Sequence, residues 1–138
     1  MVKVMDFKLV LAFCFLVGLL GCSKQADDVS EAISLSRDGV SLLSQSNEEG
    51  VEDSKKIELS ALGLEKLKLS KTIYIDLLAD DPENGMLHNN YGWVQLKIGE
   101  LQGAKESFRE AMKYKNDVHP LTSLENNIKE LESLLSTN

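Results

Sequence analysis

The sequence lacks the short motifs that mark the commonest catalytic and cofactor sites. It contains no HExxH pair of zinc ligands, no glycine-rich phosphate-binding loop and no GxSxG nucleophile turn. Its two histidines, His88 and His119, lie 31 positions apart, with no cysteine or paired acidic residue at metal-ligand spacing. We therefore expect surface or packing roles for both histidines, no metal, no cofactor, and a chain that is not an enzyme.

Basic residues are also scarce in this chain. Lysine and arginine together number 15 against 22 aspartates and glutamates, which gives a formal net charge of -7. Nucleic acids and anionic lipid surfaces attract proteins through clustered positive charge. The composition thus argues against a nucleic-acid partner and against electrostatic attachment to a membrane.

One apolar run stands near the amino terminus. Lys3 and Lys8 precede residues 9–20, which are almost uninterruptedly apolar. The run is shorter than the roughly 20 residues that span a bilayer as a helix, and positive charge before a short apolar core is typical of a cleavable signal peptide. An uncleaved membrane anchor is the alternative.

The apolar run closes with Leu19-Leu20-Gly21-Cys22, which resembles the lipobox of bacterial lipoproteins. The resemblance implies that residues 1–21 are removed and that the Cys22 thiol takes a diacylglycerol and becomes the new amino terminus. Cys14 would be discarded with the signal, so no thiol would remain for disulfide, metal or nucleophilic chemistry.

The processed chain would start with residues 22–28, the lipidated cysteine and a polar tether of at most roughly 20 Å when extended. Loss of two lysines and one aspartate would leave 13 basic and 21 acidic residues, a net charge of -8. Ser23 follows the cysteine where enteric inner-membrane lipoproteins often have aspartate. This resemblance favours the outer membrane, facing the periplasm.

The stretch from Asn89 to Met112 predicts two antiparallel amphipathic helices joined at Gly99. Apolar and packing positions of the first helix recur at helical spacing, at Tyr91, Val94, Gln95 and Ile98. Those of the second helix form one face, at Leu101, Ala104, Phe108, Ala111 and Met112.

This hairpin resembles a tetratricopeptide repeat, whose second helix carries the pattern A-x3-F followed by another alanine. The matching positions are Gly92 and Ala104 at the close helix approach, Gly99 at the turn, Phe108 and Ala111. His88 and Gln95 depart from the family's usual tryptophan and tyrosine. The resemblance implies a short solenoid of helical hairpins that binds other proteins.

A second copy of the pattern lies 34 residues earlier, at the period of this family. The shift superimposes Leu67 on Leu101, Ser70 on Ala104, Tyr74 on Phe108 and Leu78 on Met112. Repeats are therefore expected at about 51–84 and 85–118, with Asp81-Pro82 ending the first. The alternative is that residues 55–80 form one bent helix.

Two further helices flank these repeats. Val29 begins an amphipathic pattern that ends near Gln45, and residues 121–136 carry apolar residues on one face as a capping helix. The expected fold is therefore all-α, a single domain over residues 29–138, a size that can sustain one core.

In tetratricopeptide proteins the first helix of each hairpin lines the concave binding face. By position, this resemblance implies partner-binding roles for Met86, Asn89, Asn90, Trp93, Leu96 and Lys97, with Lys55 and Leu59 from the first repeat. Asn90 and Lys55 match two positions of the family's carboxylate clamp, but Leu59 replaces a required asparagine, so no clamp is expected. Trp93, the single tryptophan, is either a binding anchor or a core residue beneath a flanking helix.

The expected function is that of a membrane-anchored protein-interaction module that supports assembly or stability of an envelope complex. Pilus-biogenesis lipoproteins with tetratricopeptide repeats are similar in layout, so a pilus or secretion apparatus is the expected setting. A periplasmic small-ligand-binding lipoprotein, with a pocket beneath Trp93, is the alternative. A catalytic envelope lipoprotein would need a polar constellation that the sequence lacks.

Overall fold

The structure is a computed structural model that describes residues 7–118 and 121–137. Side chains are described from Lys24 onward, apart from that of Asp117. All the regular structure in these ranges is helical. The elements within these ranges are α1 (Phe7–Ser46), α2 (Asp53–Asp80), α3 (Gly85–Lys97), α4 (Leu101–Lys113), the 3-10 helix η1 (Lys115–Asp117) and α5 (Leu121–Ser136). The predicted all-α class is confirmed. His119 and Pro120 lie outside the described residues.

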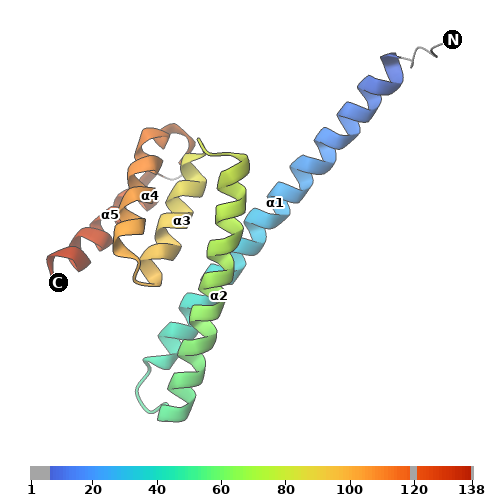
Figure 1. The fold of residues 1–138 in the computed structure, drawn as a ribbon. Helices are drawn as coiled ribbons and strands as arrows, with labels where there is room; N and C mark the ends of the chain where they lie inside the picture. Colours follow the sequence, from blue (N-terminus) through green and yellow to red (C-terminus); the bar gives the residue numbers. More distant parts are fainter. Residues whose placement is uncertain (1–6, 119–120, 138) are drawn as a thin grey trace.

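The helices pack as two antiparallel pairs followed by a single helix. Helix α1 pairs with α2, α3 pairs with α4 and also packs on α2, and α5 packs on α4 and α3 (Figure 1). The carboxyl-terminal part of α1 lies along α2, whereas its amino-terminal part projects away from the other helices. Among the described residues, no helix combines the length and the apolarity needed to cross a membrane.

Helix α1 also contains the segment predicted as a tether. Residues 23–28 are helical rather than extended. At about 1.5 Å per residue, this segment spans roughly 9 Å. The predicted end of the first helix near Gln45 agrees with the end of α1 at Ser46.

The ends of α2 and α3 follow from a few residues. Helix α2 ends at Asp80, two residues before Pro82, which cannot continue a helix because it lacks an N–H. Asn84 then caps α3, since its side-chain oxygen accepts the Leu87 N–H at 3.1 Å. Gly99 takes a left-handed φ of 82° after α3, as expected for a turn glycine.

The first predicted repeat is wrong in its helix boundaries. Residues 51–84 hold the single helix α2, so the alternative of one helix across residues 55–80 is the correct one. The partner of α2 is α1, which packs closely enough that a Cβ atom added to Gly63 would lie 2.8 Å from the Gly39 carbonyl oxygen. Gly63 therefore allows a close helix contact and makes no turn.

The 34-residue correspondence nevertheless holds for the second helix of each pair. Leu67, Ser70 and Tyr74 of α2 are at most 1% exposed, and they correspond to packing residues of α4. The Ser70 hydroxyl donates to the Ala32 carbonyl oxygen of α1 at 2.8 Å. The 34-residue period does not extend to the first helix of each pair. Helix α1 ends at Ser46, and the loop at residues 47–52 follows it, so α1 lies earlier in the sequence than the period predicts.

Two apolar clusters form the core. The first joins α1, α2 and α3 and contains Ala32, Leu67, Tyr74, Leu77, Leu87 and Val94. The second joins α3, α4 and the cap, and contains Leu96, Ala104, Phe108, Ala111, Val118, Leu124 and Leu131. Met112, expected on the apolar face of α4, is instead 44% exposed.

Candidate functional site

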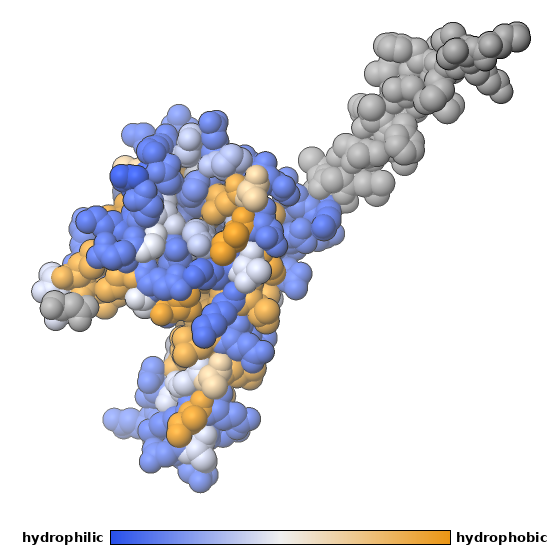
Figure 2. Space-filling view, viewed as in Figure 1, coloured by the Kyte–Doolittle hydropathy of each residue, from blue (hydrophilic) through white to orange (hydrophobic). Residues whose placement is uncertain are grey.

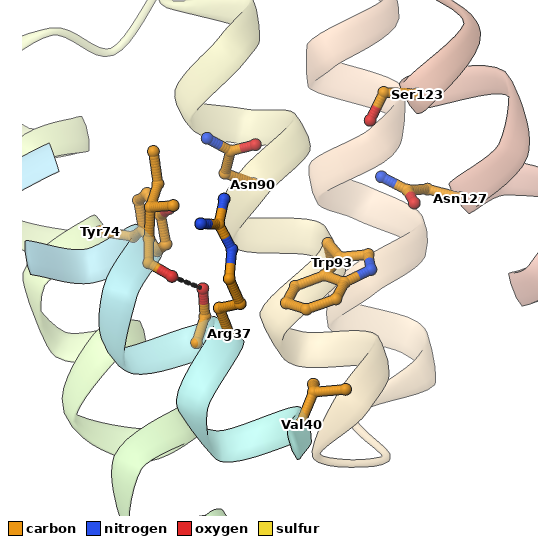
Figure 3. A pocket seen from close by; sticks show the side chains of 9 residues that line it. Arg37, Val40, Tyr74, Asn90, Trp93, Ser123 and Asn127 are labelled. Atoms are coloured by element: carbon orange, nitrogen blue, oxygen red, sulfur yellow. Dashed lines mark hydrogen bonds between the residues drawn. The ribbon is translucent and has the colours of Figure 1, made fainter. Parts of the chain in front are cut away.

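A hollow of about 360 Å³ opens where α1, α3 and α5 face one another. Its lining comes from four helices and consists of Ile33, Ser36, Arg37, Val40, Tyr74, Asn90, Trp93, Ser123 and Asn127. Figure 3 shows Arg37 reaching from α1 toward Asn90, with Trp93 on the side that faces Asn127. Basic, amide, hydroxyl and aromatic groups therefore meet in one place.

The wall formed by α2 and α3 is polar but neutral. Tyr74 is 1% exposed, and burial raises the pKa of its phenol to about 12, while a hydrogen bond with the Asn90 side chain lowers it in part. Beside them the Ser36 hydroxyl donates to the Ile33 carbonyl oxygen at 2.9 Å, the dashed line in Figure 3. These groups fix the shape of the wall.

Helix α5 is held against α3 by polar contacts at the rim of the hollow. The Asn127 amide donates to the Asn89 side-chain oxygen at 3.0 Å. Lys97 forms an ion pair with Glu130, and its ammonium lies 5.4 Å from the centre of the Trp93 ring. These contacts fix one side of the hollow and hold Lys97 over the indole.

Two of the expected partner-binding residues line the hollow. Asn90 and Trp93 do so, and Trp93 is half-buried because its other side packs on the first core cluster. Trp93 thus has features of both predicted roles, core residue and exposed anchor.

The other expected contact residues lie elsewhere. Asn89 is 3% exposed and Leu96 is 4% exposed, so their predicted places on the open face are wrong: Asn89 faces α5 and Leu96 belongs to the second cluster. Met86 and Lys97 are half-buried and are not part of the lining.

The sequence patterns missed the contribution of α1 and α5. Lys55 and Leu59, assigned to the concave face by position, line a different hollow near the loop between α1 and α2. In their place α1 supplies Ile33, Arg37 and Val40, which recur at intervals of four and three residues and so share one helix face. That spacing was the available signal.

The lining offers groups that can bind a ligand. Arg37 is its single charged residue, and Arg37 has no ion pair with any described residue. Within residues 7–118 and 121–137, no group of three acidic, histidine or cysteine side chains is placed to hold a metal ion. The groups present can bind a carboxylate or carbonyl through Arg37 and stack on an aromatic face.

Tyr74 predicts a loss of stability at high pH. The phenol pKa is about 12 in the folded protein against about 10 in an unfolded chain, so its stabilising contribution is complete below about pH 10 and is lost as the pH rises through about 12. By about pH 11 the loss should reach about 1 kcal/mol relative to a Tyr74→Phe variant. Urea unfolding of both proteins at pH 8 and pH 11 measures this loss in the free energy of unfolding. If the free energy of unfolding fell equally in the two proteins between these pH values, the prediction would be wrong.

The chain was compared with known protein families, with curated proteins and with solved structures. None of the three comparisons found a match. The function is therefore inferred from the residues and geometry of the hollow.

Proposed function

We propose that this protein is a lipid-anchored module of the bacterial cell envelope that binds a segment of another protein in the hollow between α1, α3 and α5. The observation that carries the proposal is Trp93, which is half-buried in a concave lining beside Arg37. Tryptophan and arginine are the residues most often found as anchors in protein interfaces. In this proposal the module supports the assembly or stability of an envelope complex such as a pilus or secretion apparatus.

The charge of the lining suggests which segment would bind. The whole chain carries a net charge of -7, yet the lining contains no carboxylate and one guanidinium. An extended or helical segment with an acidic side chain near Arg37 and an apolar side chain on Trp93 would satisfy both groups. The negative net charge of the chain would disfavour strongly acidic segments that do not place an acidic side chain at Arg37.

A small molecule is the second candidate occupant. The volume of about 360 Å³ falls within the roughly 300 to 1,000 Å³ usual for small-ligand pockets. Native mass spectrometry of the purified protein would separate the two candidates, because a retained small ligand adds a far smaller mass than a retained protein partner.

The proposed location follows from the amino-terminal sequence. Lys3, Lys8, the apolar run and the Leu19-Leu20-Gly21-Cys22 order support removal of residues 1–21 and lipidation of Cys22. Ser23 after the cysteine favours the outer membrane. The lipid would then hold the helical domain at the periplasmic face.

Charge reversal at Arg37 tests the binding site. Arg37→Glu is expected to weaken recovery of the partner at least about ten-fold when the full chain is isolated from membranes, because two repelling carboxylates would replace an attractive pair. The side chain is exposed, so the melting temperature should stay within a few degrees.

Lys129→Glu provides the matched control, since Lys129 is exposed on α5 and lies outside the lining. This control should recover the partner normally. Equal recovery with both variants would place the binding surface elsewhere, and Trp93 emission, the single tryptophan signal, reports directly on occupancy of the hollow.

A further inference from the structure

A second concave surface lies between α4 and α5. It is a groove of about 310 Å³ that shares no lining residue with the hollow between α1, α3 and α5. Apolar atoms are visible over the carboxyl-terminal end of α5 in Figure 2. Each helix supplies four lining residues, which are Lys105, Phe108, Arg109 and Met112 from α4, and Ile128, Leu131, Glu132 and Leu135 from α5.

The lining forms one continuous stripe on each helix. In both helices its four members are separated by three, one and three residues, so they share one helix face. Phe108 and Leu131 are buried and form the floor of the groove. Met112 is 44% exposed, and Ile128 and Leu135 are half-buried. The groove is therefore an apolar seam that is still open to solvent.

The two sides of the groove carry opposite charge. The α4 side has Lys105 and Arg109, whereas the α5 side has Glu132. Arg109 is already paired with Glu106 and Glu110 of its own helix. Lys105 and Glu132 are exposed, and neither forms an ion pair with a described residue. One unpaired ammonium and one unpaired carboxylate thus line the same groove from opposite sides.

We propose that a second copy of this chain docks on the groove between α4 and α5, with a two-fold axis that runs along the groove. Rotation about this axis puts α4 of one copy opposite α5 of the other. Lys105 of each copy then lies on the side that faces Glu132 of the other, so that one interface gains two ion pairs. The half-buried and exposed apolar residues of both grooves would be covered between the copies.

The charge pattern selects both this occupant and this orientation. The chain has a net charge of -7, so most of its surface repels another copy, whereas the groove lining has two basic residues and one acidic residue. A two-fold axis across the groove would place each helix against its own copy, and Lys105 and Arg109 would then meet like charges. An unrelated segment would need both an acidic and a basic edge, which a second copy supplies by symmetry.

Two copies of the full chain that carry different epitope tags test the proposal, after extraction from cells in a mild detergent. Wild-type copies should co-purify. Lys105→Glu in both copies should reduce co-purification at least about ten-fold, because like charges would then face each other at both contacts. Glu132→Lys in both copies should have the same effect for the same reason.

The mixture of the two variants is the decisive measurement. A Lys105→Glu copy has carboxylates on both sides of the groove, and a Glu132→Lys copy has ammonium groups on both sides, so the mixed pair should co-purify like the wild type. Recovery in the mixed pair also excludes unfolding as the cause of the losses, since an unfolded variant has no groove. Wild-type copies that fail to co-purify, or a mixed pair that does not recover, would overturn the proposal.

Lys68→Glu and Glu58→Lys are the matched controls, because both residues are exposed on α2 and lie outside the groove. These substitutions change the net charge by the same amounts as the groove variants. Each control should co-purify with its own copy like the wild type. If the controls lost co-purification as well, net charge rather than this groove would govern the association, and the proposal would be wrong.

Discussion

Replacing Phe108 by alanine is expected to lower the free energy of unfolding by about 3 to 5 kcal/mol, the usual cost of deleting a fully buried phenylalanine side chain. Phe108 is 2% exposed and lies in the cluster that joins α3, α4 and α5. Its ring packs so closely on Gly92 that a Cβ atom added there would lie 2.7 Å from the ring. Gly92 itself carries no side chain that could fill the space left by the ring.

Urea unfolding followed by circular dichroism measures this effect. Small domains are stable by only about 5 to 15 kcal/mol, so the variant is expected to unfold at a much lower urea concentration than the wild type. Met112→Ala is the control on the same helix, because its side chain is 44% exposed and should cost less than about 1 kcal/mol. Similar losses in the two variants would mean that the assigned packing face of α4 is wrong.

The second hairpin could be predicted because its signals are local. Asn84 before α3, Gly99 after it, and the spacing of Ala104, Phe108 and Ala111 on α4 each act within a few residues of the chain. The capping helix was equally readable, since Leu124 and Leu131 are buried as the pattern requires. Burial of the corresponding residues of α2 shows that the 34-residue period was informative there as well.

The pairing of α1 with α2 could not be predicted from local signals in the same way. A repeat pattern assigns a partner helix by sequence distance, and residues 51–63 were the nearest candidate. The actual contact is made by Gly39 of α1 with Gly63, two glycines that permit close approach across a loop. The choice between a turn and a close approach for Gly63 depends on tertiary packing, which the local sequence does not reveal.

The same limitation explains the mixed outcome at the hollow. Asn90 and Trp93, both expected to contact a partner, line the hollow, whereas Asn89 and Leu96, expected beside them, do not. Asn89 bonds to Asn127 of α5, 38 residues away, and Leu96 lies in the second core cluster, to which α5 contributes Leu124 and Leu131. The position of α5 over α3 depends on such long-range contacts. A combined substitution of Trp93 and Asn89 would therefore disturb the contact between α3 and α5 as well as partner binding. The Arg37→Glu substitution is the better test of binding.

Processing before Cys22 would retain every described side chain of α1 that packs on the core. Among the described side chains of α1, the first to pack on the core are Val29 and Ala32, and the last is Leu43. All of these residues follow Cys22 and would remain in the processed chain.

Cys22→Ser is accordingly expected to abolish lipidation and leave an unprocessed precursor that still folds. The physical reason is chemical: a serine hydroxyl cannot form the thioether that attaches the lipid, and the signal resembles one that is cleaved only after this attachment. Labelling with radioactive palmitate and intact mass measurement should show label and loss of residues 1–21 in the wild type, and neither in the variant. Cys14→Ser is the matched control and should be labelled and processed like the wild type, because Cys14 lies within the segment to be removed. Label on the Cys22→Ser protein, or an unlabelled wild type, would contradict a lipid anchor at this residue.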